Sequence, residues 1–539
     1  MNNYLIGDST TFNSKRHVSV STDEASPTTT YNDDLHTHGS PLAATESTAN
    51  TNANASPLSK YNDSSHGKSA RKIAHTRSYH DHDHEHDAAP PHSPPPPPPE
   101  PYSNCYFKKG DPALKKARNL YLKIYFSGLF LVILTIFAVF PIYWGSLWKI
   151  PAHPLQGWIV DFDGGNVGQT IVRSLTSGTG RIIKWEIVPS ARFPGGVVDV
   201  IREVEDNLAW VAVTINEGTS LRLEAASAVP DPGYNGSQAI TAYGVEARNE
   251  NAYRVFIRPY VQTSLDAIQF NFATQYATRL ASSSGIANLL ATSPQTVVSP
   301  VSYTIVNLIP FSQPVASAVV FVGLIYLLIL SFFVVMIAYN ARQVSGLNNL
   351  LNLRAIVTVR LLSSCVGYFF LSLFYSLLNL AFNLDLTKKY GHAGFMIFWM
   401  LNWIGMLAVG LALESLITLF TPQYIPFFMI LWIIANVSVC VFPIQILPRI
   451  YHYGYAAPFY NISSSTRSIA FGTKNTLGLN FGVLFAWVLV SCLTLPAIQW
   501  FVRRRERRAG VARAAAAPPG PEPGLEAGFG SGVREKEGA

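Results

Sequence analysis

The stretch PVASAVVFVGLIYLLILSFFVVMIAY, from Pro314 to Tyr339, decides the class of fold, because it is apolar throughout and contains no charged residue. A helix needs about 20 predominantly apolar residues to cross a bilayer, whereas a helix in a soluble core is normally striped with polar residues. Five more runs share this character: Tyr125–Trp148, Ala355–Phe382, Gly394–Phe420, Ile425–Leu447 and Phe481–Val502. We therefore predict a polytopic α-helical membrane protein with six transmembrane helices.

The formal net charge of +7 at pH 7 does not indicate a nucleic-acid partner, because the basic residues cluster beside the apolar runs. Basic residues in such places set the topology and contact anionic lipid. The determinants are Lys108, Lys109, Lys115 and Lys116 before the first run and Arg503, Arg504 and Arg505 after the last. Both termini are therefore predicted to be cytosolic, with membrane lipids as partners. Lys388 and Lys389, between the third and fourth runs, do not fit this topology.

The runs divide the chain into five predicted parts. Residues 1–120 form a disordered cytosolic tail with a His/Asp-rich run and a polyproline run, and residues 121–148 form the first transmembrane helix. Residues 149–313 form an extracytoplasmic domain, residues 314–502 form a five-helix transmembrane domain, and residues 503–539 form a basic, then Ala/Gly/Pro-rich, disordered cytosolic tail. The His/Asp-rich run, Tyr79–Asp87, lacks the fixed geometry of a metal site, so we predict no bound metal.

The segment between the first two apolar runs alternates strand-like and helix-like patterns, which predicts a small α/β domain. Asn166 is expected to cap the first helix, and the segment contains no cysteine, so it has no disulfide. A strand, a turn and a helix are expected over Gly157–Leu175, strands over Ile182–Pro189 and Leu208–Gly218, helices over Gly195–Asn207, from Thr219 and over Arg258–Ser283, and an extended segment over Val297–Pro310.

Four polar side chains inside the apolar runs are candidates for a functional site: Glu414, Arg360, Asn402 and Asn436. A carboxylate in the middle of a bilayer costs about 3 kcal/mol, so Glu414 must face protein or water. Such a group can serve a proton-coupled carrier, or it can pair with Arg360 or another base near the same membrane face. Asn402 and Asn436 either line a polar path or hold helices together, and the second role is the more frequent.

The polar stretch Tyr453–Gly482 lies between the last two runs and is extracytoplasmic in this topology. Its Asn-X-Ser sequon at Asn461, and another at Asn235 in the α/β domain, make both asparagines candidate glycosylation sites. We expect a short helix near STRSIAFG and an architectural role for the stretch, which joins the α/β domain to the transmembrane helices. Arg467 is the side chain expected to contribute to this architectural role.

Motifs of enzymes are absent or incomplete in this chain. DFDGG, at Asp161–Gly165, resembles the strand-DxDx[TV] nucleophile of haloacid-dehalogenase-type phosphotransferases, but Gly165 stands at the Thr/Val position. The sequence contains no GxxxxGK[ST], GxSxG or HExxH pattern. We therefore predict no catalytic residue, no cofactor and no enzymatic activity.

The layout of one span, an α/β domain and five more spans resembles the membrane subunits of type-2 ABC exporters, as do the segments IVDFDGGNVGQTIVRSL and AWVAVTINEGTSL. GYAAPFYN and STRSIAFGTKNTLGLNFGVL resemble more closely the fungal nitrosoguanidine-resistance membrane protein family, and this resemblance covers about Leu120–Arg503. It implies a plasma-membrane protein that protects against nitroso alkylating agents and influences phospholipid asymmetry.

Two functions stay open on this basis. The first is an exporter or transport subunit without its own ATPase, driven by protons through Glu414 or by a partner ATPase, for a small-molecule substrate of unknown identity. The second is a non-transporting regulator of phospholipid asymmetry or permeability. We expect either further copies of the chain or a separate subunit as partner. The connection Asn340–Arg354 either docks such a partner or caps two helices.

Overall fold

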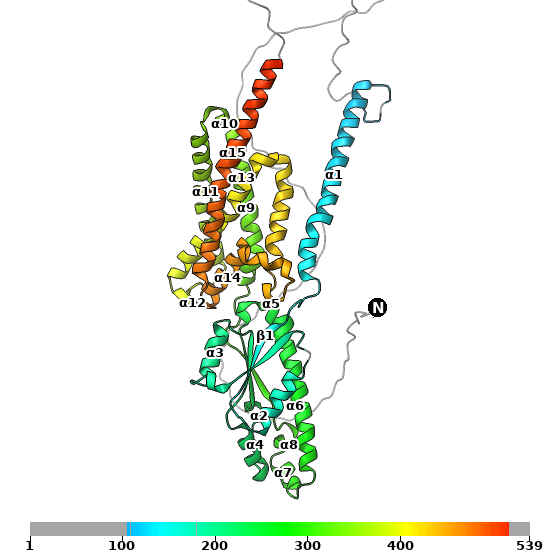
Figure 1. Cartoon of the computed structure of the whole chain (residues 1–539), viewed down its shortest axis with the longest axis vertical. Helices are drawn as coiled ribbons and strands as arrows, with labels where there is room; N and C mark the ends of the chain where they lie inside the picture. Colours follow the sequence, from blue (N-terminus) through cyan, green and yellow to red (C-terminus); the bar gives the residue numbers. More distant parts are fainter. Residues whose placement is uncertain (1–104, 108, 179, 517–539) are drawn as a thin grey trace, which may run out of the picture. The chain divides into compact units, whose positions relative to one another are not determined.

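The computed structural model describes residues 105–107, 109–178 and 180–516. The predictions for residues 1–104, for Lys108 and for residues 517–539, including the His/Asp-rich and polyproline runs, lie outside this part of the chain. All the described residues belong to one compact unit. There, an α/β domain is inserted between the first long helix and a helical bundle (Figure 1).

Helix α1, Pro112–Leu147, is apolar along most of its length and packs little against the rest of the chain. Asp111 caps its N-terminus by accepting hydrogen bonds from the backbone N–H groups of Ala113 and Leu114. The helix therefore begins nine residues before the predicted span 121–148 and includes Lys115 and Lys116. Its exposed apolar side chains are those that a bilayer would cover.

The α/β domain is built on a five-stranded sheet with the strand order β2-β1-β3-β4-β5. Every neighbouring pair is parallel except β3 with β4, which is antiparallel. All residues of the central strand β3 are buried, as expected for a sheet covered on both faces. The strands are β1 Leu155–Asp161, β2 Ile183–Val188, β3 Val211–Ile215, β4 Ile240–Gly244 and β5 Tyr303–Asn307.

Helices cover both faces of this sheet (Figure 1). Side chains alternate between the faces along a strand, so Ile159 of β1 packs with Ile171 of α2 on one face, while its neighbour Trp158 packs with Val200 of α3 on the other. Helix α6 covers the same face as α2. The helices of the domain are α2 Asn166–Thr176, α3 Val197–Glu205, α4 Thr219–Ala228, α5 Glu250–Ala252, α6 Arg258–Leu280, α7 Ile286–Thr292 and α8 Gln295–Val298.

The sequence predicted β1, β2, β3, β5 and the four longest helices of the domain to within a few residues, but β4 was missed. This strand, ITAYG, has no long apolar run to mark it. It nevertheless joins the two parts of the sheet, because it pairs with β3 on one side and with β5 on the other.

The predicted cap of α2 by Asn166 is wrong, because Asn166 is the first residue inside the helix and Gly165 precedes it without a side-chain cap. Ser220, in α4, accepts from the backbone N–H of Val167 at 3.1 Å instead. Asp163 in turn accepts hydrogen bonds from the backbone N–H and the Oγ of Ser220, at 2.8 and 2.6 Å. The turn after β1 and the start of α4 are thereby fastened to each other.

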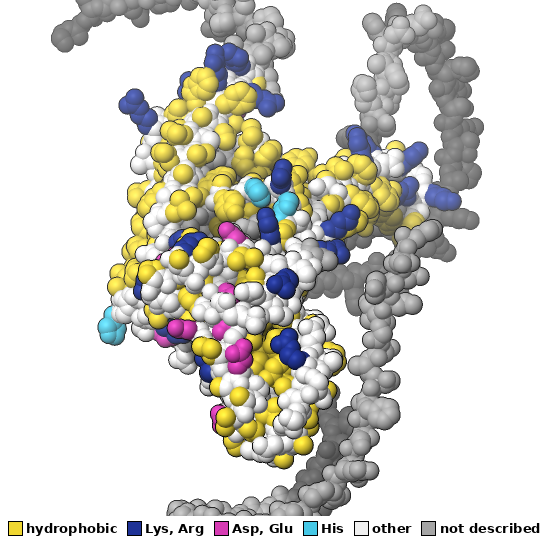
Figure 2. Space-filling model, turned by 60° about the horizontal axis from the view of Figure 1, so that its bottom comes forward, with side chains coloured by type: hydrophobic (Ala, Val, Ile, Leu, Met, Phe, Trp, Pro, Cys, Tyr) yellow, Lys and Arg dark blue, Asp and Glu magenta, His cyan; other side chains and the backbone are white. Residues whose placement is uncertain are grey.

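The bundle presents a largely hydrophobic surface, with Lys and Arg side chains at the end distant from the α/β domain (Figure 2). With α1, five helices in the described part of the chain are long and apolar enough to cross a membrane, which supports the predicted multipass character. The helices of the bundle are α9 Gly323–Val344, extended by a π-turn at Ala318–Val322, α10 Leu347–Leu350, α11 Leu353–Ala381, α12 Thr387–Tyr390, α13 Ala393–Val437, α14 Pro458–Phe471 and α15 Leu477–Ala516.

The predicted fourth and fifth spans, Gly394–Phe420 and Ile425–Leu447, are one continuous helix, α13, which contains Pro422 and Pro426. A straight helix of this length would measure about 68 Å, more than twice the roughly 30 Å of a bilayer core. Residues of α13 on both sides of the prolines nevertheless contact α14: Gly405 faces Ile462, and Asn436 accepts from the backbone N–H of Phe459 at 3.3 Å. The helix therefore folds back near its two prolines, as Figure 1 shows.

The part of α13 after this bend, Pro422–Val437, is shorter than the predicted fifth span. The helix ends at Val437, ten residues before the predicted end at Leu447, and irregular backbone with two 3₁₀ turns, Ile444–Ile446 and Arg449–Ala456, leads to α14. Helix α14 begins at Pro458, before the short helix expected near STRSIAFG, and it contains Arg467.

Candidate functional site

A buried cluster of charged side chains lies where α9, α11, α13 and α15 meet. Arg342 is in the last turn of α9, Arg360 in the first part of α11 and Glu414 in the middle of α13. Oε1 of Glu414 accepts from Nη2 of Arg342 at 2.7 Å and from Nε of Arg360 at 2.6 Å. The three side chains are at most 6% exposed, so water contributes little to their solvation.

Arg360 is the centre of this cluster, because its guanidinium contacts both α13 and α15. Its Nη1 donates to Oγ1 of Thr418 at 2.8 Å and to Oε1 of Gln499 in α15 at 2.5 Å. Its Nη2 donates to the backbone carbonyl of Glu414. Two arginines and one glutamate give the cluster a formal charge of +1, and Oε2 of Glu414 has no hydrogen-bond partner among the described residues.

The expected pairing of Glu414 with Arg360 is thus present, and Arg342 is a second partner that the sequence analysis did not single out. Its position three residues after the second apolar run, Pro314–Tyr339, was the available signal. Asn402 and Asn436 lie outside the cluster. Nδ2 of Asn402 donates to Oγ of Ser376 at 3.0 Å, whereas Nδ2 of Asn436 donates to the backbone of its own helix. The contact of Asn402 joins α13 to α11, and Oδ1 of Asn436 accepts from the backbone N–H of Phe459 in α14, so both side chains connect helices.

A second group of charged side chains joins the α/β domain to the bundle. Arg467 of α14 donates from Nη1 to the carboxylate of Glu250 in α5 and to the backbone carbonyl of Ala247, and this ion pair is largely buried. Nearby, the side-chain amides of Asn249 and Asn251 both donate to the carbonyl of Val441, at 3.3 and 3.1 Å. These contacts agree with the architectural role expected for the stretch Tyr453–Gly482.

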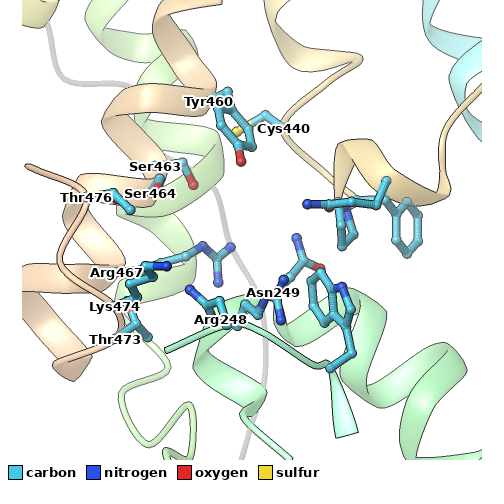
Figure 3. Close-up of a pocket in the computed structure, with 15 residues that line it drawn as sticks. Arg248, Asn249, Cys440, Tyr460, Ser463, Ser464, Arg467, Thr473, Lys474 and Thr476 are labelled. Carbon is cyan, nitrogen blue, oxygen red and sulfur yellow. Dashed lines mark hydrogen bonds between the residues drawn. The ribbon is translucent and has the colours of Figure 1, made fainter. Parts of the chain in front are cut away.

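A pocket of about 280 Å³ opens at this junction, and Figure 3 shows side chains from both sides pointing into it. Arg248 lies over the ring of Trp210, with its guanidinium carbon 3.5 Å from the ring centroid, and donates from Nη1 to the carbonyl of Ala209 at 2.9 Å. Burial lowers the pKa of Arg248 to about 9. Arg467 and Lys474 approach from the bundle side (Figure 3).

The two candidate glycosylation sites differ in accessibility. Asn235 is exposed, and its Oδ1 accepts from the backbone N–H and the Oγ of Ser237. Asn461 is only 2% exposed, and its Nδ2 donates to the carbonyls of Tyr455 and Ala457 at 3.0 and 2.9 Å. Its amide nitrogen is therefore not available to a glycan in this structure.

The described basic residues that were used to predict the topology lie near the start of α1 and in the C-terminal part of α15. Lys109 precedes α1, and Lys115 and Lys116 lie in its first turns. Arg503, Arg504 and Arg505 lie in α15, and Nη2 of Arg503 donates to the carbonyl of Asn348 in α10 at 2.9 Å. This hydrogen bond links α15 to the connection between α9 and α11.

These features define a multipass membrane protein with an α/β domain inserted after its first long helix. The chain belongs to the family described as a protein of unknown function, DUF3533, whose model matches residues 128–493. It is also 30% identical over 209 residues to a Saccharomyces cerevisiae protein described as an uncharacterised endoplasmic reticulum membrane protein. This match covers 38% of the chain and 41% of that relative.

Proposed function

We propose that this chain is a non-enzymatic, multipass regulator of lipid distribution or permeability in its membrane, and not a proton-driven exporter. The observation that carries the proposal is the double pairing of Glu414 with Arg342 and Arg360. Resistance to nitroso compounds, which the resemblance implies, then follows from slower entry of the compound.

A carboxylate that carries protons must leave its partners during each cycle and reach a water-lined path. Glu414 is completely buried, and its Oε1 is bonded to arginines of two other helices. Releasing it would leave two buried cations without their counterion, which is strongly unfavourable. The cluster is therefore better suited to fastening four helices than to moving a proton.

The proposal includes six membrane crossings, with Pro422–Val437 as the fifth. Its 16 residues are fewer than the roughly 20 that a spanning helix usually has. The fold-back of α13 supports the crossing nevertheless, because residues of that helix before and after the bend contact α14. An even number of crossings leaves both termini on one side, and the basic residues near both ends favour the cytosol. The α/β domain is then extracytoplasmic, where Asn235 is open to glycosylation.

We propose the plasma membrane as the site of action, as the resemblance implies. The name of the yeast relative supports the endoplasmic reticulum membrane as the competing location. Imaging of the tagged full chain with markers of the two membranes distinguishes them. The expected partners are membrane lipids and either further copies of this chain or a separate subunit.

The decisive experiment compares cells lacking the protein with cells producing it. Entry of a labelled nitroso compound, its efflux from preloaded cells and the surface exposure of aminophospholipids are measured in parallel. A regulator slows entry and changes lipid exposure while efflux stays the same. Faster efflux with the intact chain, without a change in entry or lipid exposure, would overturn the proposal in favour of an exporter.

A further inference from the structure

The pocket at the junction of the α/β domain and the bundle is lined by polar and cationic side chains. Its cations are Arg248 from the α/β domain and Arg467 and Lys474 from the bundle side, and its lining contains no Asp or Glu. A concave site lined by one sign of charge concentrates ions of the opposite sign. The electrostatics of this pocket therefore favour an anionic ligand.

The three cations are not equally available. Arg467 is neutralised by Glu250, so its charge is already compensated within the protein. Arg248 forms no salt bridge with any described carboxylate, and Nη1 to Ala209 is its only hydrogen bond in the described part of the chain. Lys474 is exposed, and no hydrogen bond or salt bridge involves its Nζ among the described residues. Arg248 and Lys474 thus leave two positive charges for a ligand.

The geometry of Arg248 favours one class of anion. Its guanidinium carbon lies 3.5 Å from the centroid of the Trp210 ring, and this contact positions the N–H groups before any ligand arrives. A guanidinium fork matches the oxygens of a phosphate group with two parallel hydrogen bonds, and lysine adds a point charge. The burial that lowers the pKa of Arg248 also makes an anionic partner favourable, because an uncompensated charge in a low-dielectric site is costly.

Hydroxyl groups on the bundle side complete the set of donors. Ser464 and Thr476 line the pocket, with their oxygens 3.2 Å apart, and Tyr460 lines it beside Cys440 (Figure 3). Burial raises the pKa of Tyr460, so its hydroxyl keeps the proton that it can donate. Donors on several sides suit a tetrahedral oxyanion better than a planar carboxylate.

We propose that this pocket is a binding site for a phosphate-bearing anion, held by Arg248 and Lys474. A phospholipid headgroup and a soluble phosphate are the two sources of this chemistry. The volume of about 280 Å³ lies near the lower end of the roughly 300–1,000 Å³ usual for ligand pockets, which suits a headgroup without its acyl chains. The site does not depend on the regulator proposed above, because it rests on different residues and is tested by binding alone.

The test is calorimetric titration of the purified full chain in a neutral detergent. The probes are dioctanoyl phosphatidic acid, inorganic phosphate and dioctanoylglycerol, which lacks the phosphate. We expect Arg248→Gln and Lys474→Gln each to weaken binding by about tenfold, which is roughly 1.4 kcal/mol. Arg449→Gln, which replaces an exposed arginine outside the pocket lining, is the matched control and leaves binding unchanged.

Each outcome decides the proposal. Binding of phosphatidic acid alone identifies a lipid headgroup, and binding of inorganic phosphate identifies a soluble source; either supports the site if the two pocket variants weaken it. Equal binding of dioctanoylglycerol, no binding of either phosphate probe, or variants as tight as the intact chain would overturn it. Lys474 is exposed, so its variant keeps the test valid even if Arg248→Gln is unstable.

Discussion

Arg360 donates two hydrogen bonds to Glu414, one from Nε to the carboxylate Oε1 at 2.6 Å and one from Nη2 to the backbone carbonyl. It also donates to Thr418 and Gln499, whereas the side chain of Arg342 makes a single hydrogen bond within the described part of the chain, to the same carboxylate oxygen. The two arginines therefore contribute unequally to one cluster, although both are buried and charged.

The first prediction ranks these arginines. Arg360→Gln is expected to destabilise the protein by about 3–5 kcal/mol, because it breaks a buried ion pair and leaves acceptors on two other helices unsatisfied. Arg342→Gln is expected to cost less, because it leaves the neutral pair of Arg360 and Glu414. Both variants are measured by thermal unfolding in detergent, with the loss of the monodisperse chromatographic peak as the readout. Arg354→Gln, an exposed change on the same helix as Arg360, is the control, and an equal loss in all three variants would refute the ranking.

Glu414→Gln is predicted to be the most destabilising single change in the cluster. It leaves two buried guanidinium groups without a counterion, so the formal charge rises from +1 to +2. Adding Arg342→Gln to this variant should restore part of the lost stability, because it removes one of the unpaired cations. The same unfolding assay reads out the double variant, with the exposed change Glu506→Gln as the control. A double variant less stable than Glu414→Gln alone would contradict the electrostatic explanation.

The ion pair between Arg467 and Glu250 is predicted to couple the α/β domain to the bundle. Arg467→Met and Glu250→Gln should each destabilise the chain, and the double variant should lose less than the sum of the two, by about 1–3 kcal/mol. A double-mutant cycle of unfolding measurements gives this difference. Arg449→Met tests whether loss of any arginine in this region has the same effect. Strictly additive losses would mean that the two side chains act independently.

Asp163 is predicted to make the α/β domain sensitive to acid. Burial alone would raise the pKa of this carboxyl, but the hydrogen bonds from Ser220 and Gly168 outweigh it and hold the pKa below the usual 3.8. A lowered native pKa means that the unfolded chain takes up the proton first as the pH falls, so the contribution of Asp163 is present at neutral pH and is lost below about pH 4.

The intact chain should therefore unfold at a higher temperature than Asp163→Asn at about pH 7, and this gap should shrink at about pH 3. Thermal unfolding at several pH values measures the gap. Glu217→Gln, an exposed acidic change in the same domain, should show no such convergence. A gap in unfolding temperature that widens in acid would contradict the predicted direction of the pH dependence.

Composition and strand patterns were enough to predict a multipass protein with an α/β domain after its first span. Strand β4 was not predictable, because its five residues carry no periodic signal and its pairing with β3 depends on tertiary structure. The sequence predicted two separate spans where the structure has the folded-back helix α13. Pro422 and Pro426 are visible in the sequence, but it does not show that the backbone stays helical through them.

The candidate sites likewise contain one contact that the sequence could predict and others that it could not. The pairing of Arg360 with Glu414 could be predicted because Arg360 lies near the start of its apolar run and Glu414 near the end of the next, which places both toward the same membrane face. Arg342 could not be assigned to that pair, since the rotation of α9 about its axis is decided by packing. The junction pocket could not be predicted from the sequence, because Arg248 and Lys474 are 226 positions apart. They line one pocket only when α14 docks on the α/β domain.

The five strands of the α/β domain precede α14 in the sequence, and this separation dictates an order of assembly during synthesis. All five strands are present once the ribosome has added Asn307, but Arg467 follows 160 residues later. At about 5–20 residues per second, the nascent α/β domain waits roughly 8–32 s for α14. Arg248 and Glu250 are without their bundle-side neighbours during that interval, so the junction pocket is among the last parts of the protein to be completed as the chain leaves the ribosome.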